Sequence, residues 1–404
     1  MAIITDKFYR QTIQDALGGD GVVVYGLNIF NTLIKDKEWV ILAMVSPYFS
    51  FKDPEYNPSV IDIFSLITEE EIKKLKTSSN TFFMLNYCWE GTSYLDYNFW
   101  ELLTGAAIKH GIPTEKIFFI TSNLRDEEGY DRWQKTYYPD HRINVISLNY
   151  FSQYVAHKLQ FSVSIDQTVS NIQGGQKFFL SLNRRLRPWR LYTIYKIFES
   201  RILKNTLISY DRIKPEFIDF REEFEYAVNK DVFAKLVASS PSVLDFSDFQ
   251  KNWACEPCEA ATPTPLFNKT LVSLVSETLF ETDGGNALFY SEKTFKPMLY
   301  NHPIMVFGQD GLNTTLREVG FRDYSAYFDL SFDHIQNHVD RVNAQVVQLE
   351  ILNDRLLSMT NDQKIEWLLQ DRETLEYNKN ALREQTFNKM KLQRIIDIVK
   401  AISE

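Results

Sequence analysis

Residues 177–190 read KFFLSLNRRLRPWR, and this stretch decides the fold. An apolar run at 178–181 predicts a buried strand, and residues 188–201 predict a helix. The turn between them is basic, because four of the seven residues from 184 to 190 are arginines. In a doubly wound parallel sheet this strand-to-helix turn is where phosphate binds, and the arginine fork suits a bidentate hold on oxyanions. The stretch therefore predicts an α/β sheet with an anion site; a merely solvated basic turn is the alternative.

The same alternation of strands and helices extends in both directions along the chain. Expected strands before this stretch lie at residues 21–25, 39–44, 81–87, 116–121 and 143–148, and those after it at 206–210, 270–276 and 303–307. Expected helices lie at 68–76, 97–110, 292–300 and 312–319, and the first opens on Thr68-Glu69-Glu70-Glu71, a helix-start signature. Strands that alternate with helices indicate parallel sheets with crossover helices.

The length of the chain favours two domains. A chain of 404 residues is too long for one hydrophobic core of ordinary size. The polar, aperiodic stretch 162–176 is predicted to be the linker. We expect one α/β domain over residues 1–165 and another over 177–330, with an irregular and partly helical insertion at 213–267. Residues 331–404 are predicted to be helical, with one or two amphipathic helices in 361–400.

Composition excludes several classes of protein. Hydrophobic residues make up 44% and charged residues 24%, which is ordinary for a folded globular chain. A net charge of −9 disfavours nucleic acid or anionic lipid as a general partner. No signal peptide and no run of about 18 apolar residues is found, which predicts no membrane span. Three cysteines cannot form a disulfide framework, so we expect a cytoplasmic protein, with Cys255 and Cys258 as unpaired loop thiols.

A second cationic segment lies at residues 289–297, FYSEKTFKP. Ser291 is a candidate N-cap, which places Glu292 and Lys293 in the first helical turn. A lysine there opposes the helix dipole, and this unfavourable position indicates an anionic ligand. The alternative is a solvated lysine on an ordinary capped helix.

Four segments together resemble the donor domain of the α-1,3-fucosyltransferases. They are, in the family's order, residues 178–183, 274–278, 289–295 and 302–308, and the resemblance covers roughly residues 177–308 without the insertion. It implies a GT-B glycosyltransferase, with two Rossmann-like domains that face a cleft. Residues 1–165 would form the acceptor domain and 177–330 the donor domain. The C-terminal helices would cross back to the first domain or form a homodimer.

The resemblance also assigns residues that bind the nucleotide sugar. Glu292 would contact sugar or ribose hydroxyls, Lys293 the phosphates, and Arg190 the diphosphate. The full set expected to bind the donor is Asn183, Arg187, Arg190, Glu277, Thr278, Tyr290, Ser291 and Lys293. Two positions depart from the family: Thr278 stands where the family has Asn, and Phe289 rather than Tyr290 occupies the aromatic position three before the glutamate.

For the base that deprotonates the acceptor hydroxyl, the resemblance implies a carboxylate in the N-terminal domain. Glu90, after the third expected strand and beside Trp89, is our choice, with Asp96 and Glu127 as competitors. The chain has no Asp-x-Asp pair, so cationic side chains and not a metal are expected to hold the diphosphate. No cofactor is expected beyond the donor as co-substrate, which the resemblance suggests to be GDP-linked.

The predicted function is therefore that of an inverting, metal-independent transferase that moves a sugar to a glycan or another hydroxyl acceptor. Three alternatives stay open. A retaining transferase would use the same donor residues. A non-catalytic scaffold would bind a nucleotide sugar or a glycan without turnover. A transferase could also act on a modified base in DNA, through a local Arg and Lys groove.

Overall fold

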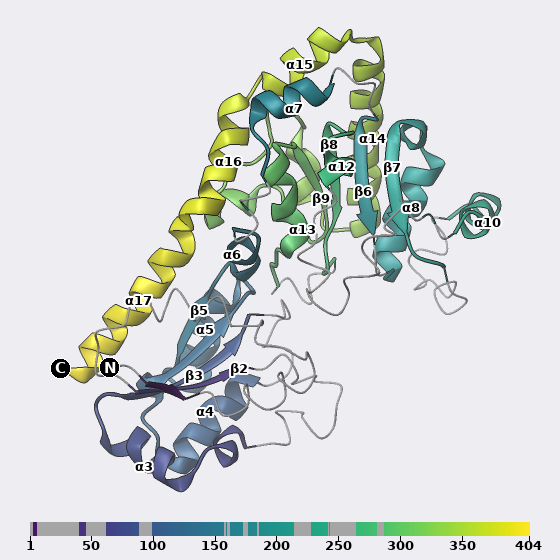
Figure 1. Cartoon of the computed structure of the whole chain (residues 1–404). Coiled ribbons are helices and arrows are strands. Elements are labelled where there is room, and N and C mark those ends of the chain that lie inside the picture. The colour runs from purple at the N-terminus through teal and green to yellow at the C-terminus, as the bar shows by residue number, and fades with distance from the viewer. Residues whose placement is uncertain are drawn as a thin grey trace. The chain divides into compact units, whose positions relative to one another are not determined.

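The computed structural model describes residues 3–5, 40–45, 62–88, 99–156, 159, 162–172, 177–183, 186–213, 228–240, 242, 264–280 and 287–404. The chain folds into two compact units. Unit 1 comprises residues 1–153, 282–289 and 385–404, and unit 2 comprises residues 154–281 and 290–384. Each unit contains one parallel sheet with helices, and the C-terminal segment is helical, which confirms the predicted α/β class (Figure 1).

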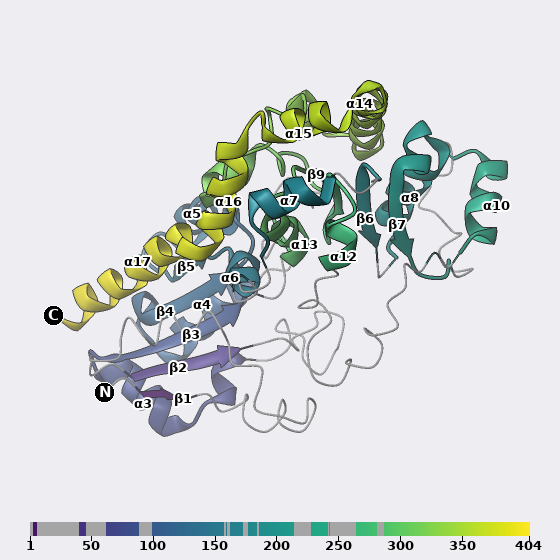
Figure 2. The same cartoon turned by 45° about the horizontal axis from the view of Figure 1, so that its top comes forward.

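The sheet of unit 1 has its described strands in chain order, β1-β2-β3-β4-β5, and all neighbours are parallel (Figure 2). The strands are β1 (Ile3–Thr5), β2 (Val40–Val45), β3 (Thr81–Tyr87), β4 (Ile117–Thr121) and β5 (Asn144–Ser147). The predicted strands at 39–44, 81–87, 116–121 and 143–148 are confirmed to within two residues, whereas β1 was not predicted. The strand expected at 21–25 lies outside the described residues.

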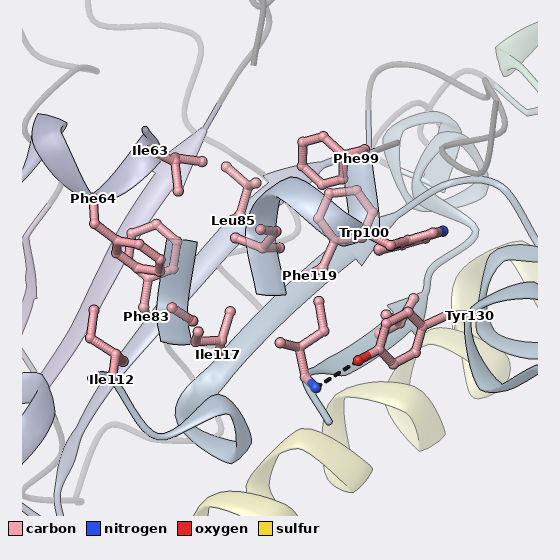
Figure 3. Close-up of a cluster of buried hydrophobic side chains, with 14 of the residues drawn as sticks. Ile63, Phe64, Phe83, Leu85, Phe99, Trp100, Ile112, Ile117, Phe119 and Tyr130 are labelled. Atoms are coloured by element: carbon pink, nitrogen blue, oxygen red, sulfur yellow. Dashed lines mark hydrogen bonds between the residues drawn. The ribbon is translucent and has the colours of Figure 1, made fainter. Parts of the chain in front are cut away.

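Both faces of this sheet are buried. On one face the strand side chains Phe83, Leu85 and Phe119 pack with Trp100 and Tyr130 from two helices (Figure 3). The Tyr130 hydroxyl is satisfied there, because it accepts a hydrogen bond from the Ile143 backbone N–H at 2.8 Å. On the other face Phe82 and Phe118 meet edge to face. A strand that is apolar on both sides is typical of parallel sheets.

The helices of unit 1 are α3 (Glu69–Thr77), α4 (Phe99–His110), α5 (Asp126–Tyr137), α6 (Tyr150–Ala156, which continues into unit 2) and α17 (Thr386–Ser403), with the 3₁₀ turns η1 (Ile63–Leu66) and η3 (Thr114–Lys116). The helix start at Thr68 is confirmed as a full capping box with Glu71. Helix α5 was not predicted. Helix α17 comes from the other end of the chain and lies beside β5 (Figure 1).

The sheet of unit 2 has the order β7-β6-β8-β9, again fully parallel. Its strands are β6 (Phe179–Asn183), β7 (Thr206–Tyr210), β8 (Val272–Ser276) and β9 (Ile304–Phe307), which confirms the four predicted strands. The chain moves outward from β6 to β7 and then returns past β6 to β8. The border between β6 and β8 is therefore a topological switch point, where open α/β sheets bind their ligands.

The helices of unit 2 include one inside the predicted linker. They are α7 (Ile165–Ile172), α8 (Pro188–Glu199), α10 (Lys230–Ala238), α12 (Thr264–Phe267), α13 (Glu292–Phe295), α14 (His338–Ser358), α15 (Asn361–Leu369) and α16 (Arg372–Glu384), with 3₁₀ helices η5 (Arg201–Asn205), η8 (Lys296–Tyr300), η9 (Thr315–Val319) and η10 (Leu330–His334). The prediction that residues 162–176 lack periodic structure is wrong for the part that forms α7. There, Ile165, Thr168 and Ile172 share one buried face of the helix.

Three other helix predictions need correction in detail. The helix expected at 292–300 is one turn of α13 followed by η8, because Pro297 has no N–H to continue the α-helical bonding. The helix expected at 312–319 is the shorter η9. Residues 361–400 hold three helices where one or two were expected. Of the described residues, none belongs to a helix both long and apolar enough to span a bilayer.

Candidate functional site

The candidate site lies at the carboxyl edge of the unit 2 sheet, where β6 and β8 separate. Backbone pairing between these strands ends at Ser181 and Leu274, two residues before the last residue of each strand. The outer pairs, in contrast, continue to Asn183 beside Tyr210 and to Ser276 beside Phe307. The two central strands thus diverge at their ends, and polar residues occupy this position: Asn183 on β6, and Ser276 followed by Glu277 and Thr278 on β8.

Glu277 organises this edge. Its side chain is fully buried and accepts four hydrogen bonds. The donors are the Thr278 N–H at 2.9 Å, the Ser291 N–H at 3.0 Å, the Ser291 hydroxyl at 2.6 Å and the Thr294 hydroxyl at 2.5 Å. A carboxylate can be buried without a large penalty only when it is satisfied in this way. Glu277 therefore fixes the start of α13 against the end of β8.

Gly308, directly after β9, leaves room for the Cβ of Glu277 and for the side chain of Leu312. A Cβ at residue 308 would lie 3.1 Å from the Glu277 Cβ and would collide with the Leu312 side chain. The absence of a side chain at this position lets β9 approach closely, and the Glu277 N–H donates to the Phe307 carbonyl at 2.8 Å.

Lys293 points back to the end of β8 from the first turn of α13. Ser291 is the N-cap, as predicted, and its hydroxyl accepts from the Lys293 N–H at 3.4 Å. The Lys293 ammonium contacts Thr278 Oγ1 at 3.1 Å, Ser291 Oγ at 3.0 Å and Glu292 Oε1 at 3.2 Å. Its side chain stays 29% exposed, so a ligand could still reach the charge.

The arginine turn reaches the same two residues from the other side. The Arg190 guanidinium donates to the Glu277 carbonyl at 3.1 Å, and that of Arg187 donates to the Thr278 carbonyl at 3.2 Å. Arg190 is buried, so it is not the solvated arginine of the alternative interpretation. In the sequence, Arg187 and Lys293 are 106 residues apart (293 minus 187). In the fold, both of them and Arg190 contact the pair Glu277–Thr278.

Glu292 and Tyr290 behave differently from each other. Burial alone would raise the pKa of Glu292, but the charges of Lys293 and Lys296 outweigh it and the pKa lies below its usual value. Glu292 is therefore a buried, ionised hydrogen-bond acceptor. The Tyr290 hydroxyl donates to the Leu312 carbonyl at 2.6 Å, and burial raises the pKa of this phenol well above its usual range. The Tyr290 side chain therefore holds its own segment against the unit 2 core.

Two buried side-chain oxygens lie where β6 and β8 diverge and can accept further hydrogen bonds. The Asn183 amide donates to Ser181 Oγ at 2.9 Å, whereas its Oδ1 has no hydrogen-bond partner among the described residues. The Ser276 hydroxyl likewise lacks one within the described part of the chain. Buried polar atoms are almost always paired in native proteins, so these two oxygens mark a place that accepts hydrogen-bond donors from elsewhere.

Of the three carboxylates predicted as candidate bases, the structure describes Glu127. Glu90 and Asp96 lie outside the described residues, so their placement stays a prediction. Glu127 already binds Lys391 at 2.6 Å, Arg394 at 2.7 Å and the Ser147 N–H at 2.7 Å. A carboxylate with these three partners attaches α17 to the sheet.

The cysteines give no further candidate among the described residues. Burial raises the pKa of the Cys88 thiol to about 12. Cys255 and Cys258 lie outside the described residues.

Sequence reasoning missed three residues of this site: Ser276, Thr294 and Gly308. Ser276 directly precedes the predicted site residue Glu277, and Thr294 directly follows Lys293. Serine at the end of a strand and threonine in a helix are ordinary residues, so neither stands out in the sequence. Only the fold, which brings both to Glu277 and to the divergence of β6 from β8, distinguishes them. Gly308 had a signal, since the resemblance ends on it.

Comparisons with known proteins give a likeness in structure alone. No protein-family model and no curated protein sequence matches the chain. Among solved structures, a UDP-forming α,α-trehalose-phosphate synthase from Burkholderia xenovorans is 11% identical, with a TM-score of 0.44 over 94% of this chain and 79% of that one. The trehalose-6-phosphate synthase OtsA is also 11% identical, with a TM-score of 0.45 over 98% of both chains.

Proposed function

We propose that the chain is a glycosyltransferase whose unit 2 binds a nucleotide-diphosphate sugar where β6 and β8 diverge. The observation that carries this proposal is the convergence of Arg190 and Lys293 on Glu277–Thr278. A single anion placed over these two residues would lie near both cations. The place is also the switch point of the sheet, which is the general ligand position for this architecture.

The charges around the site suit a diphosphate. Arg187, Arg190, Lys293 and Lys296 contribute four positive charges, and the carboxylates of Glu277 and Glu292 contribute two negative ones. These six side chains together therefore carry a net positive charge. When a glycosidic bond breaks, negative charge grows on the diphosphate leaving group. Cations that are already fixed in place stabilise that charge without reorganising, which is the main electrostatic contribution to catalysis.

The remaining polar groups suit the hydroxyls of the donor. Glu292 is held ionised, so it can accept hydrogen bonds from sugar or ribose hydroxyls. Asn183 Oδ1 and Ser276 Oγ offer two further acceptors. A donor bound here would therefore satisfy buried oxygens as well as neutralise charge.

For the transfer step we propose an inverting reaction without a metal, in a GT-B arrangement. Glu90 of unit 1 would remove the proton from the acceptor hydroxyl, and the positive residues of unit 2 would replace the metal that other transferases use. GDP as the nucleotide, and a glycan or other hydroxyl compound as the acceptor, complete the proposal.

Thermal shift with a panel of nucleotide-diphosphate sugars tests donor binding. One donor is expected to raise the melting temperature, because a ligand that binds only the folded state stabilises it. Lys293→Ala should weaken that donor about tenfold or more, since a charge-assisted hydrogen bond contributes about 1.5–3 kcal/mol. Lys235→Ala, at an exposed position of α10, is the matched control and should keep the shift. No shift with any donor would contradict the proposal.

Donor hydrolysis distinguishes an enzyme from a scaffold. A transferase should release nucleoside diphosphate slowly from the donor even without acceptor, and Lys293→Ala should abolish this release. A donor that binds tightly and is never cleaved would instead indicate the non-catalytic nucleotide-sugar scaffold. Analysis of the product anomer then separates inversion from retention.

A further inference from the structure

Residues 287–289, directly before the proposed donor segment, belong to unit 1 and not to unit 2. The Leu288 N–H donates to Asn123 Oδ1 at 2.9 Å, and the Leu288 carbonyl accepts from the Leu124 N–H at 2.9 Å. The ring of Phe289 lies edge to face on Phe151, with centroids 5.5 Å apart. The segment Ala287–Phe289 is thus buried and doubly hydrogen-bonded just beyond the end of β4.

Asn123 is itself held rigidly. Its Nδ2 donates to Asp126 Oδ1 at 2.9 Å, and its backbone N–H donates to Thr121 Oγ1 at 3.0 Å. The Thr121 hydroxyl donates in turn to Asp126 Oδ2 at 2.7 Å, which closes a small network. All three side chains are buried. A closed network of this kind fixes the Oδ1 atom that receives Leu288.

The chain leaves this anchor and reaches the donor segment almost at once. Ser291 is the next anchored residue of the backbone, because its N–H and hydroxyl both bind Glu277 in unit 2. Only Phe289 and Tyr290 separate Leu288 from Ser291. Leu288 and Ser291 are three residue steps apart, which span at most about 11 Å when extended, so a shift of Leu288 has little slack to absorb it. The buried Tyr290 hydroxyl on Leu312 reduces the slack further.

We propose that Asn123 is a positioning residue: by holding Leu288, it restrains the donor segment Tyr290–Lys293 that follows directly in the chain. This inference rests on the proposed function for its consequence in binding, but the coupling itself does not need a ligand. Asn123 would set the position of Ser291 and Lys293 through the chain and would not touch the donor. Loss of its Oδ1 should therefore loosen residues 290–294 as well as residues 287–289.

Hydrogen–deuterium exchange of the full chain tests the coupling without any ligand. Asn123→Ala is expected to raise exchange of the amides at 290–294 about fivefold, the effect of losing one ordinary hydrogen bond. Asn123→Ala removes the hydrogen bonds that Asn123 Oδ1 accepts from the Leu288 and Arg125 N–H groups. The matched control is Asn144→Ala, which also removes two side-chain-to-backbone hydrogen bonds in unit 1, to the carbonyls of Glu115 and Ile117 at the start of β4. The control should leave residues 290–294 unchanged. Faster exchange confined to residues 287–289 would overturn the inference.

Binding of GDP and of UDP, measured by calorimetry, supplies the second readout. Asn123→Ala should weaken whichever nucleotide binds the parent chain by about fivefold, and Asn144→Ala should not. If neither nucleotide nor any donor binds the parent chain while exchange at 290–294 still responds to Asn123→Ala, the proposed function fails and the coupling stands. If Asn123→Ala does not fold, Thr121→Val, which removes only the supporting hydroxyl, should show the same pattern of exchange at smaller amplitude.

Discussion

Glu277 shows what a single residue contributes to this architecture. It receives hydrogen bonds from a loop, from the N-cap of α13 and from the helix itself, and its backbone carbonyl receives Arg190. Removing a partner from a buried carboxylate of this kind leaves charge unsatisfied, which costs several kcal/mol. The proposed donor site therefore depends on a residue whose side chain is fully occupied by the protein and need not touch the donor.

His302 is a second buried residue with a measurable consequence. Its Nδ1 is bound to the Ser273 hydroxyl at 3.0 Å and its Nε2 to the Phe267 carbonyl at 3.0 Å. Burial lowers the pKa of this imidazole from 6.5 to about 4. The neutral form is favoured in the folded state, so the unfolded state takes up a proton first as the pH falls. The stabilisation is complete above pH 6.5 and is lost between 6.5 and 4, by about 3 kcal/mol in all.

The urea midpoint measured at several pH values checks this prediction. Between pH 7 and pH 5 the parent chain should lose about 2 kcal/mol through this group, and His302→Gln, although less stable at pH 7, should lose less over the same interval. Val347→Ala, at an exposed position of α14 in unit 2, is the control: it changes no titratable group and should keep the parent slope. Parallel pH profiles for the parent chain and His302→Gln would show that the prediction is wrong.

At the scale of elements, the attachment of α17 depends on charge as well as on apolar contact. Glu127 on α5 binds Lys391 and Arg394 of α17, and its side chain is 20% exposed. Glu127→Gln should lower the stability of unit 1 by about 1–2 kcal/mol, because two partly shielded ion pairs are lost together. The effect should shrink in 1 M salt.

Glu128→Gln is the matched control for this element. Glu128 pairs with Arg132 within α5 on an exposed surface, so its loss should cost less than about 0.5 kcal/mol. Thermal melting at low and high salt measures both variants. Equal effects of the two substitutions would refute a special role for Glu127 in holding α17.

The strands were easier to predict from the sequence than the helices were. Runs such as Thr81–Tyr87 and Thr206–Tyr210 are short, apolar and bounded by turn residues, and both were found at the predicted bounds. Helix α5 was missed because its sequence DEEGYDRWQKTY is polar and contains Gly129, so its stability comes from a few buried side chains such as Tyr130. Helix α7 was missed because its flanks are polar and the buried face has only three residues.

At the scale of the whole molecule, two parallel α/β sheets were predicted, but their strand order was not. Periodicity reveals which segments form strands and says nothing about which strands are neighbours. The switch point between β6 and β8 therefore emerges only in the folded chain, and with it the meeting of Arg190 with Lys293 at Glu277. Both basic turns were predicted from the sequence to be anion sites. That they meet at one site depends on contacts such as that of Arg190 with Glu277, which are 87 positions apart in the chain.

Unit 1 also depends on the far end of the chain. Four apolar residues of α17, Leu392, Ile395, Ile396 and Val399, are buried in it. A fragment of residues 1–153 is therefore expected to be poorly soluble and to lack near-ultraviolet circular dichroism, because burying such side chains contributes about 1.5–3 kcal/mol each. Linking residues 385–404 to the fragment should restore a folded signal, whereas a linked segment with these four residues changed to serine should not. A well-folded 1–153 fragment would contradict this.

The path of the chain has a consequence for recombination between related proteins. Because the backbone changes unit at 153/154, 281/282, 289/290 and 384/385, a chimera that exchanges one whole unit needs four junctions. A single crossover near the middle of the gene would graft a foreign α17 and a foreign Leu288 onto a native sheet. Successful hybrids should therefore keep those two short pieces with the half that comes first in the gene.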